Sequence, residues 1–186
     1  VWVMDADGAN RQRLGRSPEI LSQLEELQDR ERYAPEGDRF AFSQAASPED
    51  ARTQIFLTIP VPLRTGGRWF TQLTFLDGNS TSPAWSPDGN WIAFVSSALD
   101  SDDIWIIQTD GNFGQTLTAN PWEWERHPTW SPDSGKIAFW SNRSGLMQIY
   151  TMNTDGSASR TAPQSEAVVA TLVRIISAPP IWRAAC

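Results

Sequence analysis

Short apolar runs recur along the chain, and residues that favour turns separate each run from the next. The clearest run spans residues 91–95, where Trp, Ile, Ala, Phe and Val follow one another between a Pro-Asp-Gly-Asn segment and two serines. Runs of this length that are rich in β-branched and aromatic residues predict β-strands. Because apolar residues occupy consecutive positions, we expect both faces of the resulting sheet to be buried.

A block of sequence is repeated with a constant offset of 45 residues. The matching segments are residues 85–89 with 130–134, 92–94 with 137–139, 104–105 with 149–150, and 110–111 with 155–156. Within the block, the Pro-Asp-Gly turn suits a tight hairpin because Pro fixes φ and Gly accepts a positive φ, and the later Asp-Gly pair gives a second hairpin. Each repeat therefore predicts four antiparallel strands.

The expected strands lie at 82–86, 91–97, 103–108 and 113–118 in the first clear repeat, and at 127–131, 136–141, 147–152 and 158–162 in the second. A four-stranded unit of this length falls in the size range of β-propeller blades, which bury both faces against their neighbours. We therefore predict an all-β fold, a β-propeller of four-stranded antiparallel blades.

Weaker copies of the repeat flank the two clear ones. The predicted divisions of this single domain are a half blade at 1–14, a degenerate blade at 31–74, blades at 82–119 and 127–162, and a worn or partial blade at 163–186. This amounts to about four blades' worth of sequence, which we expect to be an open part of a larger propeller. Between the copies, an N-cap, a first-turn Pro and an apolar stripe predict a short inserted helix at 18–31.

The repeat resembles that of a known family. The segments 127–133 (HPTWSPD), 137–141 (IAFWS), 149–152 (IYTM) and 155–157 (DGS) are similar to the WD40-like, or PD40, repeat of TolB-like propellers. Ser134 departs from the pattern, because it stands where the turn glycine is usual. The resemblance implies a propeller of six or more blades that is used for protein contacts, in a periplasmic or extracytoplasmic location. It also implies a second use, as an accessory domain beside peptidases.

Charge and composition limit the classes of molecule that the protein is expected to bind. The 15 basic and 22 acidic side chains give a net charge of −7, which disfavours nucleic acid and anionic membranes. No stretch is long and apolar enough to predict a membrane span. The chain starts on Val1 rather than Met, so we expect a piece of a longer protein. An open arc of blades would expose apolar sheet faces and self-associate, unless the two termini complete one composite blade.

The sequence predicts no catalytic machinery, metal site or cofactor. His127 is the single histidine, and neither a Gly-x-Ser-x-Gly elbow nor a phosphate-binding glycine loop is present. We therefore expect a non-catalytic protein-binding or scaffolding propeller rather than an enzyme. The alternative is the accessory propeller of a larger enzyme, such as a prolyl-oligopeptidase-type serine peptidase, whose catalytic domain this sequence does not contain.

Candidate partner-binding residues lie in the loops that differ between repeats. Strand direction alternates within a blade, so the similar turns fall on one face of the propeller and the dissimilar loops on the other. The partner is predicted to be a protein or peptide, bound by the residues Asp100, Asp102, Asp103, Trp122, Trp124, Arg126, Asn142 and Arg143. Replacement of Trp124 or Arg143 by Ala is expected to weaken binding without lowering the melting temperature.

Overall fold

The computed structural model describes residues 2–3, 12–13, 30–59 and 69–161. Within them the chain is all-β. The strands are β1 (Trp2–Val3), β2 (Gln12–Arg13), β3 (Ala41–Ala45), β4 (Thr53–Ile59), β5 (Trp69–Gln72), β6 (Ser80–Trp85), β7 (Trp91–Ser96), β8 (Asp103–Gln108), β9 (Gln115–Thr116), β10 (Glu125–Trp130), β11 (Lys136–Ser141), β12 (Gln148–Asn153) and β13 (Arg160–Thr161).

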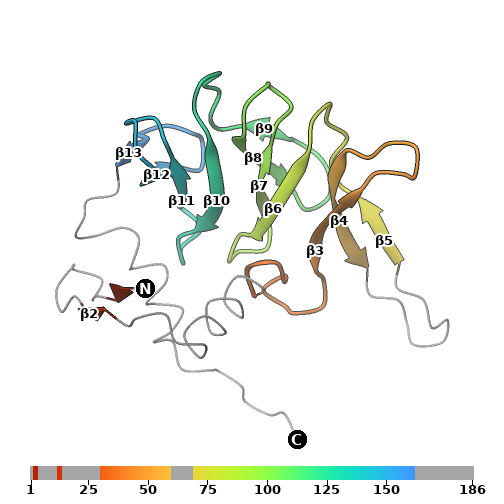
Figure 1. The fold of residues 1–186 in the computed structure, drawn as a ribbon. Coiled ribbons are helices and arrows are strands. Elements are labelled where there is room, and N and C mark those ends of the chain that lie inside the picture. Colours follow the sequence, from red (N-terminus) through yellow and green to blue (C-terminus); the bar gives the residue numbers. More distant parts are fainter. Residues whose placement is uncertain (1, 4–11, 14–29, 60–68, 162–186) are drawn as a thin grey trace, which may run out of the picture.

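Three antiparallel sheets stand side by side in chain order (Figure 1). The first blade is β3-β4-β5, the second is β6-β7-β8-β9 and the third is β10-β11-β12-β13, while β1 and β2 form a separate two-stranded sheet. The second and third blades repeat the same register, because Ala93 pairs with Ile106 in one and Ala138 with Thr151 in the other. The four-stranded antiparallel blades predicted from the 45-residue repeat are confirmed.

The first blade lacks the long first strand that the other two blades have. In place of a long first strand, Tyr33 forms an isolated antiparallel bridge with Phe40. The same turn nevertheless follows, because the Ala34 N–H donates to the carbonyl of Arg39 at 2.9 Å, as the Ser86 N–H does to Trp91. The degenerate copy in the sequence therefore keeps the turn of the repeat and loses most of one strand.

The second blade is buried on both faces. Alternate residues of β7 point in opposite directions: Ile92 and Phe94 join the core shared with the first blade, and Ala93 and Val95 join the core shared with the third. Each of these four side chains is at most 5% exposed. Trp130 adds a polar contact between sheets, because its indole N–H donates to the Ala84 carbonyl at 3.0 Å. The consecutive apolar residues of the sequence therefore reflect burial from both sides.

Backbone conformation repeats with the sequence. Gly111 and Gly156 occupy the same position of the second hairpin, with φ of 87° and 80°. In the first hairpin Gly89 has φ 77°, and Ser134 takes the same place with φ 57°. A serine thus adopts the left-handed conformation that glycine adopts at lower cost.

The innermost strands β6 and β10 carry a matching irregularity. The register shifts between Thr81 and Ala84 in β6 and between Arg126 and Thr129 in β10. Ser82 and His127 each have a φ of 53° at this point. His127 thus lies at a bulge within β10.

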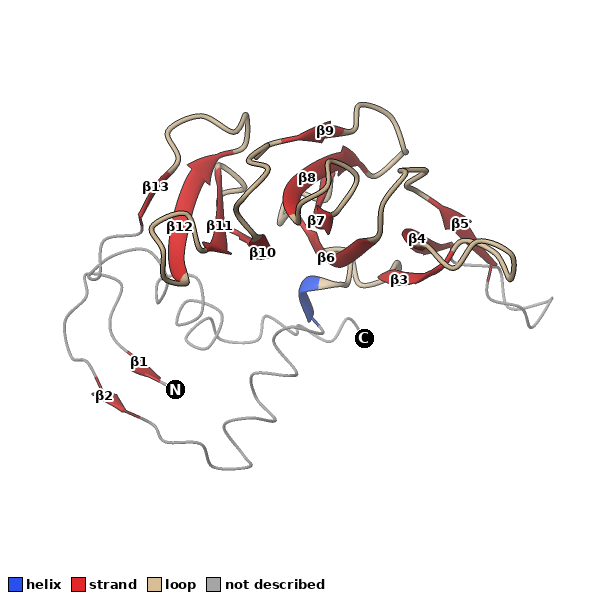
Figure 2. Ribbon diagram, turned by 45° about the horizontal axis from the view of Figure 1, so that its top comes forward, coloured by secondary structure: helices blue, strands red, loops and turns tan. Residues whose placement is uncertain are grey.

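Several expectations lie outside the described residues. Residues 18–29 of the helix predicted at 18–31 lie outside the described residues. Among the described residues, helical backbone occurs only at Arg30 and Glu31, so an inserted helix is not supported (Figure 2). The predicted worn blade at 163–186 and most of the half blade at 1–14 are also outside them. Within the described part of the chain, there is no helix that is both long and apolar enough to cross a membrane.

The two equivalent hairpin glycines predict a graded loss of stability. Gly156→Ala should destabilise the protein more than Gly111→Ala, although both changes place a side chain at positive φ. A Cβ at 156 would meet the Leu117 carbonyl oxygen at 2.9 Å, whereas a Cβ at 111 would meet only the movable Leu73 side chain at 3.7 Å. Urea unfolding of both variants checks this, and equal losses would contradict the contact with Leu117.

Candidate functional site

The hairpin topology divides the connections into two faces. We call residues 46–52, 73–79, 97–102, 117–124 and 142–147 the loop face; the loops after β7 and β9 rise at the top of Figure 1. We call residues 35–39, 86–90, 109–114, 131–135 and 154–159 the turn face. All of these connections are described, so the predicted binding residues can be placed one by one.

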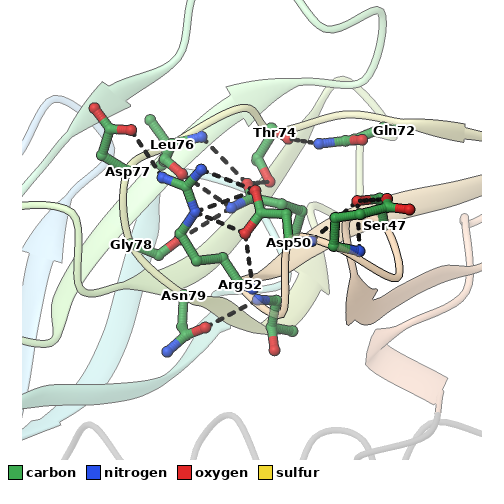
Figure 3. A network of polar contacts seen from close by, with 12 residues as sticks. Ser47, Asp50, Arg52, Gln72, Thr74, Leu76, Asp77, Gly78 and Asn79 are labelled. Atoms are coloured by element: carbon green, nitrogen blue, oxygen red, sulfur yellow. Dashed lines mark hydrogen bonds and ion pairs between the residues drawn. The ribbon is translucent and has the colours of Figure 1, made fainter.

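Arg52 organises the loop face where the first and second blades meet (Figure 3). Its guanidinium binds the Asp50 carboxylate, with an Nη2–Oδ2 distance of 2.8 Å, and reaches Asp77 through Nη1 at 2.9 Å. The hydrogen bond from the Arg52 side chain holds the pKa of Asp50 below its usual value. Because these groups are exposed, the ion pairs add little to the free energy of folding. Their main effect is to hold the loop at 46–52 against the loop at 73–79.

Beneath this surface network lies a buried clasp. Gln54, which is 2% exposed, donates from Nε2 to the carbonyls of Leu76 and Gly78 at 3.0 Å each. Its Oε1 accepts the hydroxyl of Thr74 at 2.8 Å, and the Thr74 hydroxyl oxygen in turn accepts the N–H of Ile55. The clasp joins the third strand of the repeat to the loop that leads into the next blade.

The second blade repeats this clasp with a carboxylate. Asp103 is fully buried and accepts hydroxyls from Ser101 at 2.8 Å and from Thr118 at 3.1 Å. Thr118 also accepts the N–H of Ile104, as Thr74 does from Ile55 in the first blade. Burial raises the pKa of Asp103, and the two hydroxyl hydrogen bonds oppose that rise. Asp103 therefore lies beneath the loop face and does not present its carboxylate to a partner.

Arg143 is partly buried, and its guanidinium turns toward a fully buried carboxylate. Its Nη2 lies 2.9 Å from Oε1 of Glu125, a side chain with no exposed surface, and its Nη1 donates to the Ser159 hydroxyl at 2.8 Å. The guanidinium carbon lies 4.7 Å from the centre of the Tyr150 ring. Oε2 of Glu125 has no hydrogen-bond partner among the described residues, so Arg143 supplies the charge compensation of a buried carboxylate.

Arg126 and Asp102 link the second and third blades at the surface. The Arg126 Nη2 lies 2.6 Å from the Asp102 carboxylate, and its guanidinium carbon lies 5.2 Å from the centre of the Trp124 ring. The backbone N–H of Trp124 donates to Oδ1 of Asn142 at 2.7 Å. Asn142 thus positions the loop that carries the tryptophans, and Arg126 covers one of their rings.

Apolar side chains are exposed around these groups. Trp122 is 89% exposed and Trp124 is 53% exposed, and Asp100 also lies at the surface. The sequence analysis missed four further apolar side chains that are exposed on the loop face: Phe75, Leu99, Leu146 and Met147. Leu99 and Leu146 are apolar residues that follow polar or small ones in a connection, which could have indicated their exposure. Met147 falls inside the strand expected at 147–152 and Phe75 inside an apolar segment, so neither gave such a signal.

The single histidine, His127, lies on β10. His127 is exposed, and its ring meets Trp140 edge-on at 6.2 Å between ring centres. The groups of three or more acidic, His or Cys side chains needed for a metal site do not occur in the part of the chain that the structure describes.

The buried ion pair predicts a stability effect that differs from the one expected from sequence. Arg143→Ala should lower the free energy of unfolding by about 3 to 5 kcal/mol, because it leaves Glu125 buried and uncompensated. Arg126→Ala, whose partner is more exposed, should cost about 1 kcal/mol or less. Urea unfolding measures both losses.

Adding Glu125→Gln to Arg143→Ala should recover part of the loss, because it removes the uncompensated charge. Similar small losses in the two arginine variants would contradict the structural role of Arg143.

Comparisons with known proteins agree with the fold. The family described as the TolB β-propeller domain (PD40) matches residues 1–172. An uncharacterized protein of Agrobacterium fabrum, Atu1656, is 31% identical over 96 residues, which cover 51% of this chain and 30% of that protein. An uncharacterized peptidase of Bacillus subtilis, YuxL, is 35% identical over 93 residues, which cover 48% of this chain and 14% of that protein.

A solved structure of a putative TolB from Agrobacterium tumefaciens superposes with a TM-score of 0.58 at 26% identity, covering 69% of this chain and 46% of that one. The matches span less than a third of either curated relative and less than half of this structure. The repeat, the stacked blades and the match over residues 1–172 together show that the chain belongs to the TolB β-propeller domain family.

Proposed function

We propose that this chain is a non-catalytic protein-binding or scaffolding propeller and that the loop face is its binding surface. The observation that carries the proposal is the placement of exposed apolar side chains. Six of the ten exposed large hydrophobic residues in the described chain lie on the loop face, and one, Phe113, lies on the turn face. Exposed apolar patches of this kind mark interaction sites in soluble proteins.

The scaffold under the loops supports the same proposal. The clasps made by Gln54 and Asp103 fix the beginning of each inter-blade loop, so the exposed tips are carried on a rigid base. Variable loops on a rigid scaffold are where binding residues concentrate, and Trp and Arg are enriched among the residues that dominate interface energies. Of the residues predicted from sequence, Trp122, Trp124 and Asp100 are exposed and remain the leading candidates, and Arg126 is exposed but paired with Asp102.

A second candidate function is that of an accessory propeller in a larger serine peptidase. The 35% identity to YuxL, whose name describes an uncharacterized peptidase, favours it. On this hypothesis the described blades would act in substrate access, and the hydrolytic residues would lie outside the sequence given. The full-length protein decides between the two: covalent labelling by an active-site serine probe supports the peptidase, and lack of labelling supports the binding propeller.

The first blade also supports self-association. Phe42, Phe56 and Phe70 form an aromatic cluster on the first blade, with ring centres 5.8 Å apart. Phe70 is 51% exposed and Phe42 is partly exposed, whereas Phe56 beneath them is buried. The equivalents of Phe42 in the later blades, Phe94 and Phe139, are buried against the preceding sheet. The cluster is therefore a blade-packing face without a described blade on it.

We expect light scattering to give a mass above that of the monomer, and Phe70→Glu to lower it by placing a charge on the packing face. Phe113→Glu, which changes an equally exposed ring on the turn face, should leave the mass unchanged. A parent protein that is a stable monomer would show that the cluster is covered within one chain, as in a closed ring.

Site-specific crosslinking tests the binding face. A photoreactive phenylalanine analogue at position 122 should crosslink partner proteins from an extract of the source cells, because this side chain extends from the loop face. The same analogue at position 113, which is 77% exposed on the turn face, is the matched control and should crosslink little. Crosslinking from position 113 alone would place the binding surface on the opposite face.

A further inference from the structure

The loop face between the second and third blades combines an apolar surface with excess negative charge. Three loops meet there: 97–102, 117–124 and 142–147. The N–H of Glu125, the first residue of β10, donates to the Asp102 carbonyl at 2.7 Å, which joins the first loop to the strand that follows the second. Asn142 accepts the N–H of Trp124 at 2.7 Å, which joins the second to the third. The junction patch, as we call it, is therefore a single surface built from three connections.

Its exposed apolar part comes from all three loops. The contributing side chains are Leu99 (45% exposed), Trp122 (89%), Trp124 (53%), Leu146 (73%) and Met147 (47%). Two aromatic and three aliphatic side chains give a partner both flat rings and flexible apolar surface. Such a set fits apolar side chains of a peptide segment better than a small polar ligand.

Charge on the loop face is strongly one-sided. Its five segments contain six acidic side chains and two arginines: Glu49, Asp50, Asp77, Asp100, Asp102 and Glu123 against Arg52 and Arg143. Both arginines, and Arg126 on the neighbouring strand, are already paired with carboxylates of the protein. These pairs also engage Asp50, Asp77 and Asp102, so the net negative charge of the face comes from its excess of acidic over basic side chains.

Among the carboxylates of the three patch loops, Asp102 and Glu123 pair with arginines, and Asp100 is exposed. It lies in the exposed part of the 97–102 loop with φ 68°, and within the described residues its side chain makes no hydrogen bond or ion pair. The turn face differs, because its aspartates serve their own hairpins; Asp110, for example, accepts the N–H of Asn112 at 2.9 Å, and that bond holds its pKa below the usual value. Free negative charge and exposed apolar surface therefore coincide at the junction patch.

We infer that the junction patch binds a cationic apolar peptide segment of a protein partner, in which Lys or Arg side chains alternate with large hydrophobic ones. The apolar side chains of the peptide pack on the tryptophans and aliphatic residues of the patch, and its cations approach Asp100 and its acidic neighbours. Charge complementarity selects this occupant over an acidic segment, which the three carboxylates of the patch loops, Asp100, Asp102 and Glu123, repel. The inference rests on the proposed binding function of the loop face and specifies the chemistry of its partner.

Fluorescence anisotropy with three labelled peptides of equal length tests the inference on the full chain. The peptides alternate Lys with Leu, Glu with Leu, and Lys with Ser. The Lys/Leu peptide should bind, and the other two should bind at least about tenfold more weakly, because each lacks one of the two matching features. Equal binding of the Glu/Leu peptide would overturn the inference.

Three variants locate the binding. Trp122→Ala should weaken binding of the Lys/Leu peptide about tenfold, as expected for a central aromatic contact. Asp100→Asn removes one charge and keeps a residue that tolerates the positive φ, so it should weaken binding and reduce its salt dependence. Phe113→Ala, on the turn face, is the matched control and should have no effect. A loss in Phe113→Ala equal to that in Trp122→Ala would show non-specific adsorption and contradict the site.

The outcome separates this inference from the broader proposal. Crosslinking of protein partners from position 122 without any charge preference in the peptide series would leave the loop face as the binding surface and refute a cationic partner. Failure of both experiments would refute the loop face itself.

Discussion

The fold depends on sheets that are apolar on both faces and therefore cannot be stable alone. In the second blade, alternate residues of one strand supply two different cores: Ile92 and Phe94 on one side, Ala93 and Val95 on the other. Neither set can be buried within its own sheet, so each sheet requires a neighbour on each side. The order of blades along the chain, the contacts of the innermost strands and the exposed aromatic face of the first blade all follow from this requirement.

Where two sheets stack, the backbone N–H and carbonyl groups near the junction still need hydrogen-bond partners. The clasps of Gln54 and Asp103, with their threonines, supply such partners. Gln54 and Asp103 differ chemically but occupy equivalent positions, and each bonds to a threonine that also accepts a strand N–H. Because the base of each inter-blade loop is tied down in this way, its tip is free to vary without loss of the fold. The loop face can therefore carry exposed side chains such as Trp122 that contribute nothing to the core.

The sequence predicted the parts of the structure that repeat. Strands β7, β8 and β11 lie within one residue of their expected ends, because similar turns and apolar runs recur 45 positions apart. The bulge at Ser82 and His127 was not predicted, since a bulge leaves the apolar pattern of a strand almost unchanged. The burial of Asp103 and Arg143 could not be predicted either. Loop position indicates exposure, and only the three-dimensional neighbours, Thr118 and Glu125, reveal that these charges point inward.

Equivalent positions in the two complete blades show how a structural pair can shape the binding face. In the second blade, Ser80 and Ser96 face each other with their hydroxyl oxygens 3.4 Å apart. In the third blade, the place of Ser80 is taken by Glu125, and Arg143 stands where the second blade has Ala98. A buried carboxylate is tolerable there only because the arginine compensates it, and the same arginine lies 3.8 Å from Glu123 in the neighbouring loop. The pair thereby fixes two of the three loops of the junction patch against each other. A residue that stabilises the blade therefore also determines the shape of the surface offered to a partner, and the two roles can be separated only by comparing Arg143 with exposed residues such as Trp122.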